Sequence, residues 1–182
     1  MPRRSPGRNS LGGELARKSL TRAIKLDPRN YSAMGNLADI IFNLGEFQLA
    51  LDYYKRMDKM EPSRPMTLAR IGSSYFEMGK CEHALESLLG AATILNESKP
   101  RTQADAYIYR DVEVFSRIRA AECFIELSRP VDARSEIARV LEISNCPDCK
   151  TTSREIARSK LRAEVLLLRL DAMAPAKAEA SR

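Results

Sequence analysis

The sequence predicts an all-α fold built from stacked pairs of antiparallel helices. Pro28 and Pro62 lie 34 residues apart and each follows a similar short segment, and a period of this length is typical of helical repeats. Aromatic residues make up only 6% of the 182 residues and tryptophan is absent, which disfavours a β-sandwich. No apolar run approaches the ~18 residues that a membrane-spanning helix needs.

The period divides the centre of the chain into two units, residues 31–64 and 65–98. At equivalent positions of the two units, large apolar residues mostly match large ones and small residues match small ones. The matched places hold Met34, Leu37, Ala38, Ile41, Phe47, Ala50, Tyr54 and Met57 in the first unit, and Leu68, Ile71, Gly72, Tyr75, Cys81, Ala84, Leu88 and Ala91 in the second. Gly45 and Gly79 are expected in the turns between helices, where the chain needs a positive φ.

This pattern resembles the tetratricopeptide repeat family. The segments "NLADIIFNLGEFQLALDYYKRMDKMEP" and "RIGSSYFEMGKCEHALESLLGAA" each fit the family pattern over a full unit. The resemblance implies a right-handed solenoid of helical hairpins, with a concave surface lined by the first helix of each unit.

The repeat domain is predicted over residues 14–173, between disordered ends. Its parts are a half repeat at 14–30, full repeats at 31–64 and 65–98, an insertion at 99–113, a third repeat at 114–147 and a capping helix at 152–173. The tails are residues 1–13, which are basic and rich in Pro and Gly, and residues 174–182. The insertion could form a loop and an extension of the next helix.

The capping helix is expected to cover the apolar face that the last repeat would otherwise expose. Thr152 and Glu155 have the spacing of a capping box at its start. One apolar stripe runs along it, through Ala157, Leu161, Val165, Leu168 and Ala172.

The inward places of the repeats predict a groove that binds a partner peptide. Phe42, Phe76 and Ile125 form an apolar row beside polar and partly basic rows, which suits an extended or helical peptide. The candidate residues are Asn36, Asp39, Phe42, Asn43, Met66, Arg70, Ser73, Phe76, Ile118, Arg119, Glu122 and Ile125. The alternative is that Phe42 and Phe76 pack against neighbouring helices within the stack.

The predicted function is therefore that of a scaffold, an adaptor or a client chaperone. The segment "RAAECFIEL" resembles the opening of the third repeat in translocator chaperones of type III secretion, and that resemblance implies a hydrophobic client. An alternative is a co-chaperone that recognises an acidic C-terminal peptide. Asn36 and Arg70 match two ligands of such a carboxylate clamp, but Met66 stands where a lysine is required.

The basic character of the chain belongs to its ends. Residues 1–30 hold eight basic and two acidic residues, a net charge of +6, which equals that of the whole chain. A nucleic-acid-binding body would need Lys and Arg clustered on its own surface, so no nucleic acid is expected. The basic start could be a solvated tail or a targeting segment, and a homodimer stays possible.

No catalytic group, cofactor or metal is predicted. Cys81 and Cys123 fall at core places, and His83, the single histidine, is expected on an exposed helix face. Cys146 and Cys149 form a CxxC that is interpreted as loop thiols, with a metal or redox role as the alternative. Four cysteines without an apolar secretory segment suit a reducing, cytoplasmic compartment.

Overall fold

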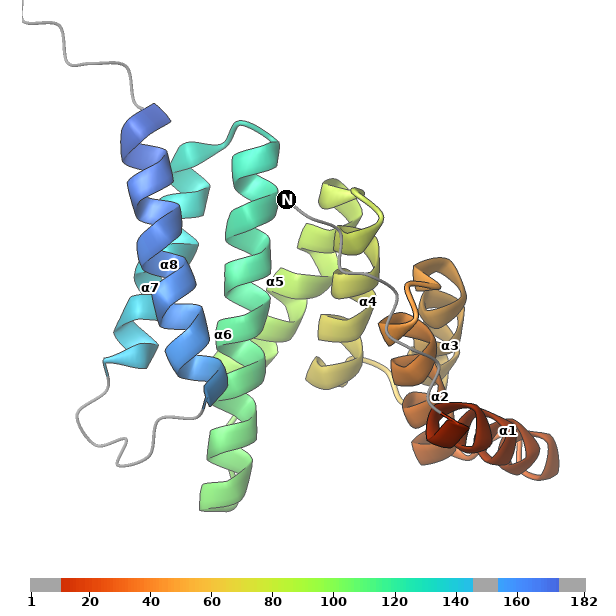
Figure 1. Ribbon diagram of the computed structural model, residues 1–182. Coiled ribbons are helices and arrows are strands. Elements are labelled where there is room, and N and C mark those ends of the chain that lie inside the picture. The colour runs from red at the N-terminus through yellow and green to blue at the C-terminus, as the bar shows by residue number, and fades with distance from the viewer. Residues whose placement is uncertain (1–10, 146–153, 174–182) are drawn as a thin grey trace, which may run out of the picture. The chain divides into compact units, whose positions relative to one another are not determined.

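The computed structural model describes residues 11–145 and 154–173, and every regular element in those ranges is a helix (Figure 1). The all-α prediction is confirmed. The helices are α1 (Leu11–Leu26), α2 (Tyr31–Asn43), α3 (Phe47–Met60), α4 (Pro65–Glu77), α5 (Cys81–Glu97), α6 (Gln103–Glu126), α7 (Pro130–Ser144) and α8 (Arg154–Met173). They fall into two compact units, residues 1–87 and 88–182, which divide inside α5.

In the first unit α2 and α3 form a hairpin, α1 packs on α2, and α4 packs on α3. The hairpin closes over a core that the repeat pattern predicted. Its most deeply buried members are the predicted residues Met34, Leu37, Ala38, Ile41, Ala50, Tyr54 and Met57, together with Leu51, which was not predicted. Ala38 and Ala50 have no exposed surface, because small side chains at these places let the two helices approach closely.

Three turns between paired helices share one geometry. Gly45 and Gly79 have φ of 85° and 71°, as the sequence predicted, and Ser128 takes the same place in the third hairpin with φ of 57°. In each turn this residue donates its N–H to a carbonyl three residues back. The distances are 2.9 Å from Gly45 to Phe42, 2.9 Å from Gly79 to Phe76, and 3.1 Å from Ser128 to Ile125. The turns therefore make Phe42, Phe76 and Ile125 equivalent.

Replacing Ser128 by glycine is expected to stabilise the second unit by about 1 kcal/mol. A left-handed φ strains any residue with a Cβ, and the exposed Ser128 side chain adds no buried contact to offset that strain. Urea denaturation followed by circular dichroism would measure the gain. Gly45→Ala is the matched control and should lose a similar amount. A destabilised Ser128→Gly variant would contradict the prediction.

The second unit is built around α6, which is longer than the other helices. It begins at Gln103, within the predicted insertion, behind a capping box in which Thr102 and Asp105 exchange hydrogen bonds of 3.0 and 3.1 Å. Its buried face and that of α7 use the predicted residues Ala120, Ala121, Phe124, Ala133, Ile137 and Val140. Both α7 and α8 pack on α6, and α8 also packs on α7 (Figure 1).

The stripe predicted for the capping helix is wrong, because it faces away from the fold. Leu161, Val165 and Leu168 are 64%, 55% and 70% exposed, and Ala157 and Ala172 are exposed as well. The packed face of α8 instead carries Ile156, Ser159, Ala163, Leu166 and Leu170. Both sets have helical spacing, so periodicity alone could not choose between them.

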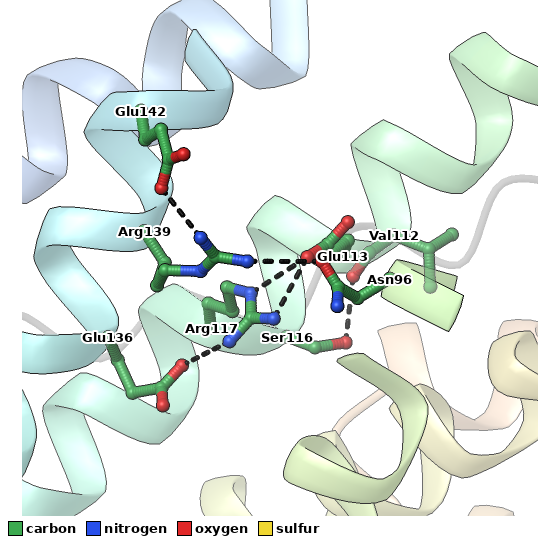
Figure 2. Close-up of polar contacts among 8 residues, drawn as sticks. All are labelled: Asn96, Val112, Glu113, Ser116, Arg117, Glu136, Arg139 and Glu142. Atoms are coloured by element: carbon green, nitrogen blue, oxygen red, sulfur yellow. Dashed lines mark hydrogen bonds and ion pairs between the residues drawn. The ribbon is translucent and has the colours of Figure 1, made fainter. Parts of the chain in front are cut away.

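An ion cluster buried between α6 and α7 joins these helices (Figure 2). Arg117 donates to Glu113 on its own helix at 2.9 Å and to Glu136 of α7 at 2.8 Å, and its side chain is only 10% exposed. Burial lowers the pKa of Arg117, but the hydrogen bonds to Glu136 and Glu113 raise it by more, so the guanidinium stays charged. Nearby, Arg139 of α7 donates to Asn96 of α5 at 3.1 Å.

Several predicted features lie at or beyond the edges of the described residues. α1 starts at Leu11, ahead of the predicted start at Glu14, so Gly12 and Gly13 lie in its first turn. Thr152, the Cys146 and Cys149 motif, and most of the two predicted tails lie outside the described residues. Cys81 and Cys123 are buried and His83 is exposed, as predicted.

Candidate peptide-binding surfaces

In the first unit the predicted groove residues lie on α2 and α4, and two of them form a network with a tyrosine of α3. Tyr54 of α3 donates its hydroxyl to Asp39 Oδ1 at 2.6 Å, and Arg70 of α4 donates to Asp39 Oδ2 at 2.6 Å. The Arg70 guanidinium also lies 5.9 Å from the centre of the Tyr54 ring. Asp39 thereby fixes the position of α4 relative to the α2–α3 hairpin.

Burial raises the pKa of Tyr54 well above its ordinary value, and the hydrogen bond to Asp39 raises it further. The folded chain therefore holds the phenolic proton at a pH where the unfolded chain has released it. The contribution of Tyr54 to stability is complete below the ordinary pKa of about 10 and is lost as the pH rises beyond it.

Tyr54→Phe should remove part of the alkaline sensitivity of the chain. Above about pH 10 the wild-type free energy of unfolding should fall by about 1.4 kcal/mol per pH unit through this one group, and the variant should lack that component. At neutral pH the variant should lose about 1 kcal/mol with the hydrogen bond. Urea denaturation at pH 8 and at about pH 11 would measure both. Equal alkaline slopes in the two proteins would refute the assignment.

The rest of this surface divides into covered and open residues. Ser73 is buried and returns its hydroxyl to the Ala69 carbonyl at 2.7 Å. Phe42 packs at the edge of the core and meets the Phe47 ring at 5.1 Å in an edge-to-face contact, and Phe76 is also half-buried. Asn36, Asn43 and Met66 are exposed.

The network bears on the carboxylate clamp considered from the sequence. A clamp needs its cation to face an incoming carboxylate. Arg70 instead pairs with Asp39, so an incoming acid would have to displace an internal carboxylate at 2.6 Å. This pairing disfavours an acidic C-terminal peptide as the partner.

The predicted residues of the second unit lie on α6, and most of them are covered. Ile118, Glu122 and Ile125 are 5%, 8% and 5% exposed. Glu122 forms an ion pair with Arg162 of α8, and Ile125 lines a small pocket with Leu170 of α8. Arg119 lies 5.1 Å from the Phe115 ring. The "AAEC" segment is buried throughout, so in this chain it packs α6 into its unit.

Two further surfaces are candidate sites that the repeat pattern does not predict. One is the outer row of α8, described above. The other is a groove of about 570 Å³ along α1, lined by Glu14, Arg17, Lys18, Thr21, Arg22 and Lys25. The charge excess of residues 1–30 is the sequence signal for this groove, although the same excess also fits a solvated tail or a targeting segment.

Over residues 11–145 and 154–173, no three His, Cys, Asp or Glu side chains come together in a way that could hold a metal ion. In the same ranges, no helix is both long and apolar enough to cross a membrane.

Successive helical hairpins that share one turn geometry define a helical-repeat protein. A sequence model of the tetratricopeptide repeat family matches residues 13–65, so this segment carries the repeat of that family. No curated protein matches the sequence.

Solved structures with similar folds include the type III secretion chaperone SycD of Yersinia enterocolitica, in complex with a peptide of the translocator YopD. It aligns with a TM-score of 0.56 and 18% identity over 76% of this chain and 92% of that one. A double mutant (ArsTM) of MamA RS-1 aligns at 0.48 and 15% identity over 88% of each chain. A tetratricopeptide repeat protein of Parabacteroides merdae aligns at 0.45 and 16% identity, covering 91% and 74%.

Proposed function

We propose that the chain is a non-enzymatic scaffold that holds a segment of a partner protein on the α2–α4 surface of its first unit. The observation that carries this proposal is that side chains fixed to one another lie beside exposed side chains on that surface. Asp39, Arg70 and Tyr54 are fixed to one another, while Asn36, Asn43 and Met66 are exposed beside them. A rigid surface with open amide groups binds a peptide backbone at little cost in side-chain ordering.

The chemistry of these residues suggests the kind of segment bound. Asparagine side chains both donate and accept, so Asn36 and Asn43 can pair with the N–H and C=O groups of an extended peptide. Met66 is flexible and adapts to apolar side chains of different shapes. The half-buried rings of Phe42 and Phe76 add apolar surface. An uncharged, partly apolar segment therefore fits better than an acidic one.

A client chaperone of type III secretion is the more specific form of this proposal. Its support is the similarity of fold to SycD, a chaperone crystallised with a translocator peptide. The "RAAECFIEL" segment adds a sequence resemblance, although its alanines and cysteine are buried in this chain. A client of that kind would be hydrophobic and would stay soluble while it is bound.

Selection of a random peptide library on the intact chain, followed by fluorescence anisotropy with the best synthetic peptide, tests the proposal. Met66→Glu combined with Asn43→Ala should weaken binding at least about tenfold, because both side chains are exposed and their loss leaves the core intact. Lys59→Glu, an exposed change on α3, is the matched control. If the α2–α4 variant bound the peptide as well as the wild type, the proposal would fail.

A further inference from the structure

The outer face of α8 carries an apolar row that nothing in the second unit covers. The row consists of Leu161, Val165 and Leu168, which are at least half exposed and lie at i, i+4 and i+7 on one side of the helix. Single exposed leucines are ordinary on a protein surface. A continuous row with the spacing of a helix–helix seam is typical of a docking surface.

The packing of α8 repeats that of α4. Arg162 pairs with Glu122 as Arg70 pairs with Asp39. Glu122 precedes the positive-φ residue of its turn, Ser128, by the same number of residues as Asp39 precedes Gly45. This match gives α8 the register of a first helix. Leu168 then takes the place of Phe76 in α4, so the row lies at places that the repeat pattern assigns to partner contact.

The charge around the row selects the partner. Arg154, Arg158 and Arg169 are exposed beside it, and none of them has an ion pair within the part of the chain that the structure describes. The exposed acidic residues beside the row are Glu164 and Asp171, and Asp171 is already paired with Arg134 of α7. The face therefore combines an apolar seam with excess positive charge, which complements an acidic amphipathic helix.

A second copy of the chain fits this face poorly. Two α8 helices side by side and parallel would place Arg158 against its own counterpart. An antiparallel pair would set the edge with Arg162 and Arg169 against the same edge of the partner helix. Like charges at such positions are destabilising in either arrangement.

The two terminal segments of the same chain, which lie outside the described residues, also fit poorly. Residues 1–10 contain three arginines and no acidic residue, so they would be repelled. Residues 174–182 contain no apolar residue larger than proline, so they could not fill the seam.

We propose that α8 is a docking surface for an amphipathic helix of a different protein, with leucine-type residues along one seam and acidic residues beside it. The surface belongs to the second unit. It is independent of the α2–α4 surface and stands whether or not that surface binds a peptide.

The probe is a synthetic helical peptide with leucines at i, i+4, i+7 and i+11 and glutamates at the flanking places. Fluorescence anisotropy with the full chain should show binding at least about tenfold tighter than that of a counterpart whose glutamates are lysines. Leu161→Ser with Leu168→Ser should weaken the acidic peptide about tenfold or more, and Arg158→Glu with Arg169→Glu should do the same. Circular dichroism should show unchanged helix content, because all four residues are exposed.

The matched control changes the basic face of α1, with Lys18→Glu and Lys25→Glu, and should leave peptide binding unchanged. Binding lost in this control and retained in the α8 variants would overturn the proposal, as would equal affinity for the acidic and basic peptides. Two other results would also overturn it. One is binding of the chain to anionic phosphatidylserine vesicles that Leu161→Ser with Leu168→Ser abolishes. The other is a dimer, seen by sedimentation, that the same change abolishes. Those results would assign the row to a membrane or to a second copy.

Discussion

Arg117→Met should destabilise the second unit by about 3–5 kcal/mol, one of the two largest effects expected for a single substitution in this chain. The methionine fills similar space but leaves Glu113 and Glu136 facing each other in a site where their side chains are only 10% and 15% exposed. Two buried carboxylates without a cation cost far more than the ion pairs contribute in the native protein.

The cluster supplies its own controls. Adding Glu113→Gln and Glu136→Gln to Arg117→Met removes the uncompensated charge and should recover most of the lost stability. Arg139→Met breaks the neighbouring pair with Glu142, where both side chains are more than 40% exposed, and should cost less than about 1 kcal/mol. Urea denaturation of the four proteins measures these differences. A loss in Arg117→Met no larger than that in Arg139→Met would show that the cluster is not a buried charge site.

Leu166→Ala and Leu168→Ala should differ sharply, although the residues are two positions apart on α8. Leu166 is 6% exposed and Leu168 is 70% exposed. The first substitution opens a cavity against α6 and α7 and should cost about 2–5 kcal/mol. The second removes a solvent-facing side chain and should change stability by no more than about 0.5 kcal/mol.

Thermal and urea denaturation of the two variants compare the two faces of one helix directly. Because both changes are leucine to alanine on the same helix, differences in helix propensity cancel. A reversed order, with Leu168→Ala the more damaging, would mean that the stripe predicted from the sequence is the packed one after all.

The repeat pattern predicted most of the fold because it records local requirements. A positive φ at Gly45 and Gly79, and small residues where helices cross, are needed wherever such a hairpin forms. The third hairpin could be aligned from its alanines, although Ser128 replaces the glycine at its turn. The length of α6 was left open, since a loop and a helix extension are both compatible with the insertion.

The candidate site was less predictable. Spacing placed Asp39 and Arg70 on neighbouring first helices, and the structure brings them together. It could not show that they pair with each other and with Tyr54 instead of facing a partner. In the same way, the sequence predicts that Glu122 faces a partner, whereas in the structure it forms an ion pair with Arg162 of α8. That the predicted groove residues contact a partner stays a prediction.

The hairpins, their turns and their core positions can be predicted from the amino-acid pattern, because each depends on residues close together along the chain. The buried face of α8 cannot, because it depends on contacts with helices far away in the sequence. Two stripes of equal period compete on that helix, and the more apolar one was the natural choice from the sequence. The buried face carries the small residues Ser159 and Ala163, which let α8 lie close to its neighbours, and Arg162 beside them pairs with Glu122 of α6. The more apolar face is left exposed, where we propose that a partner helix docks.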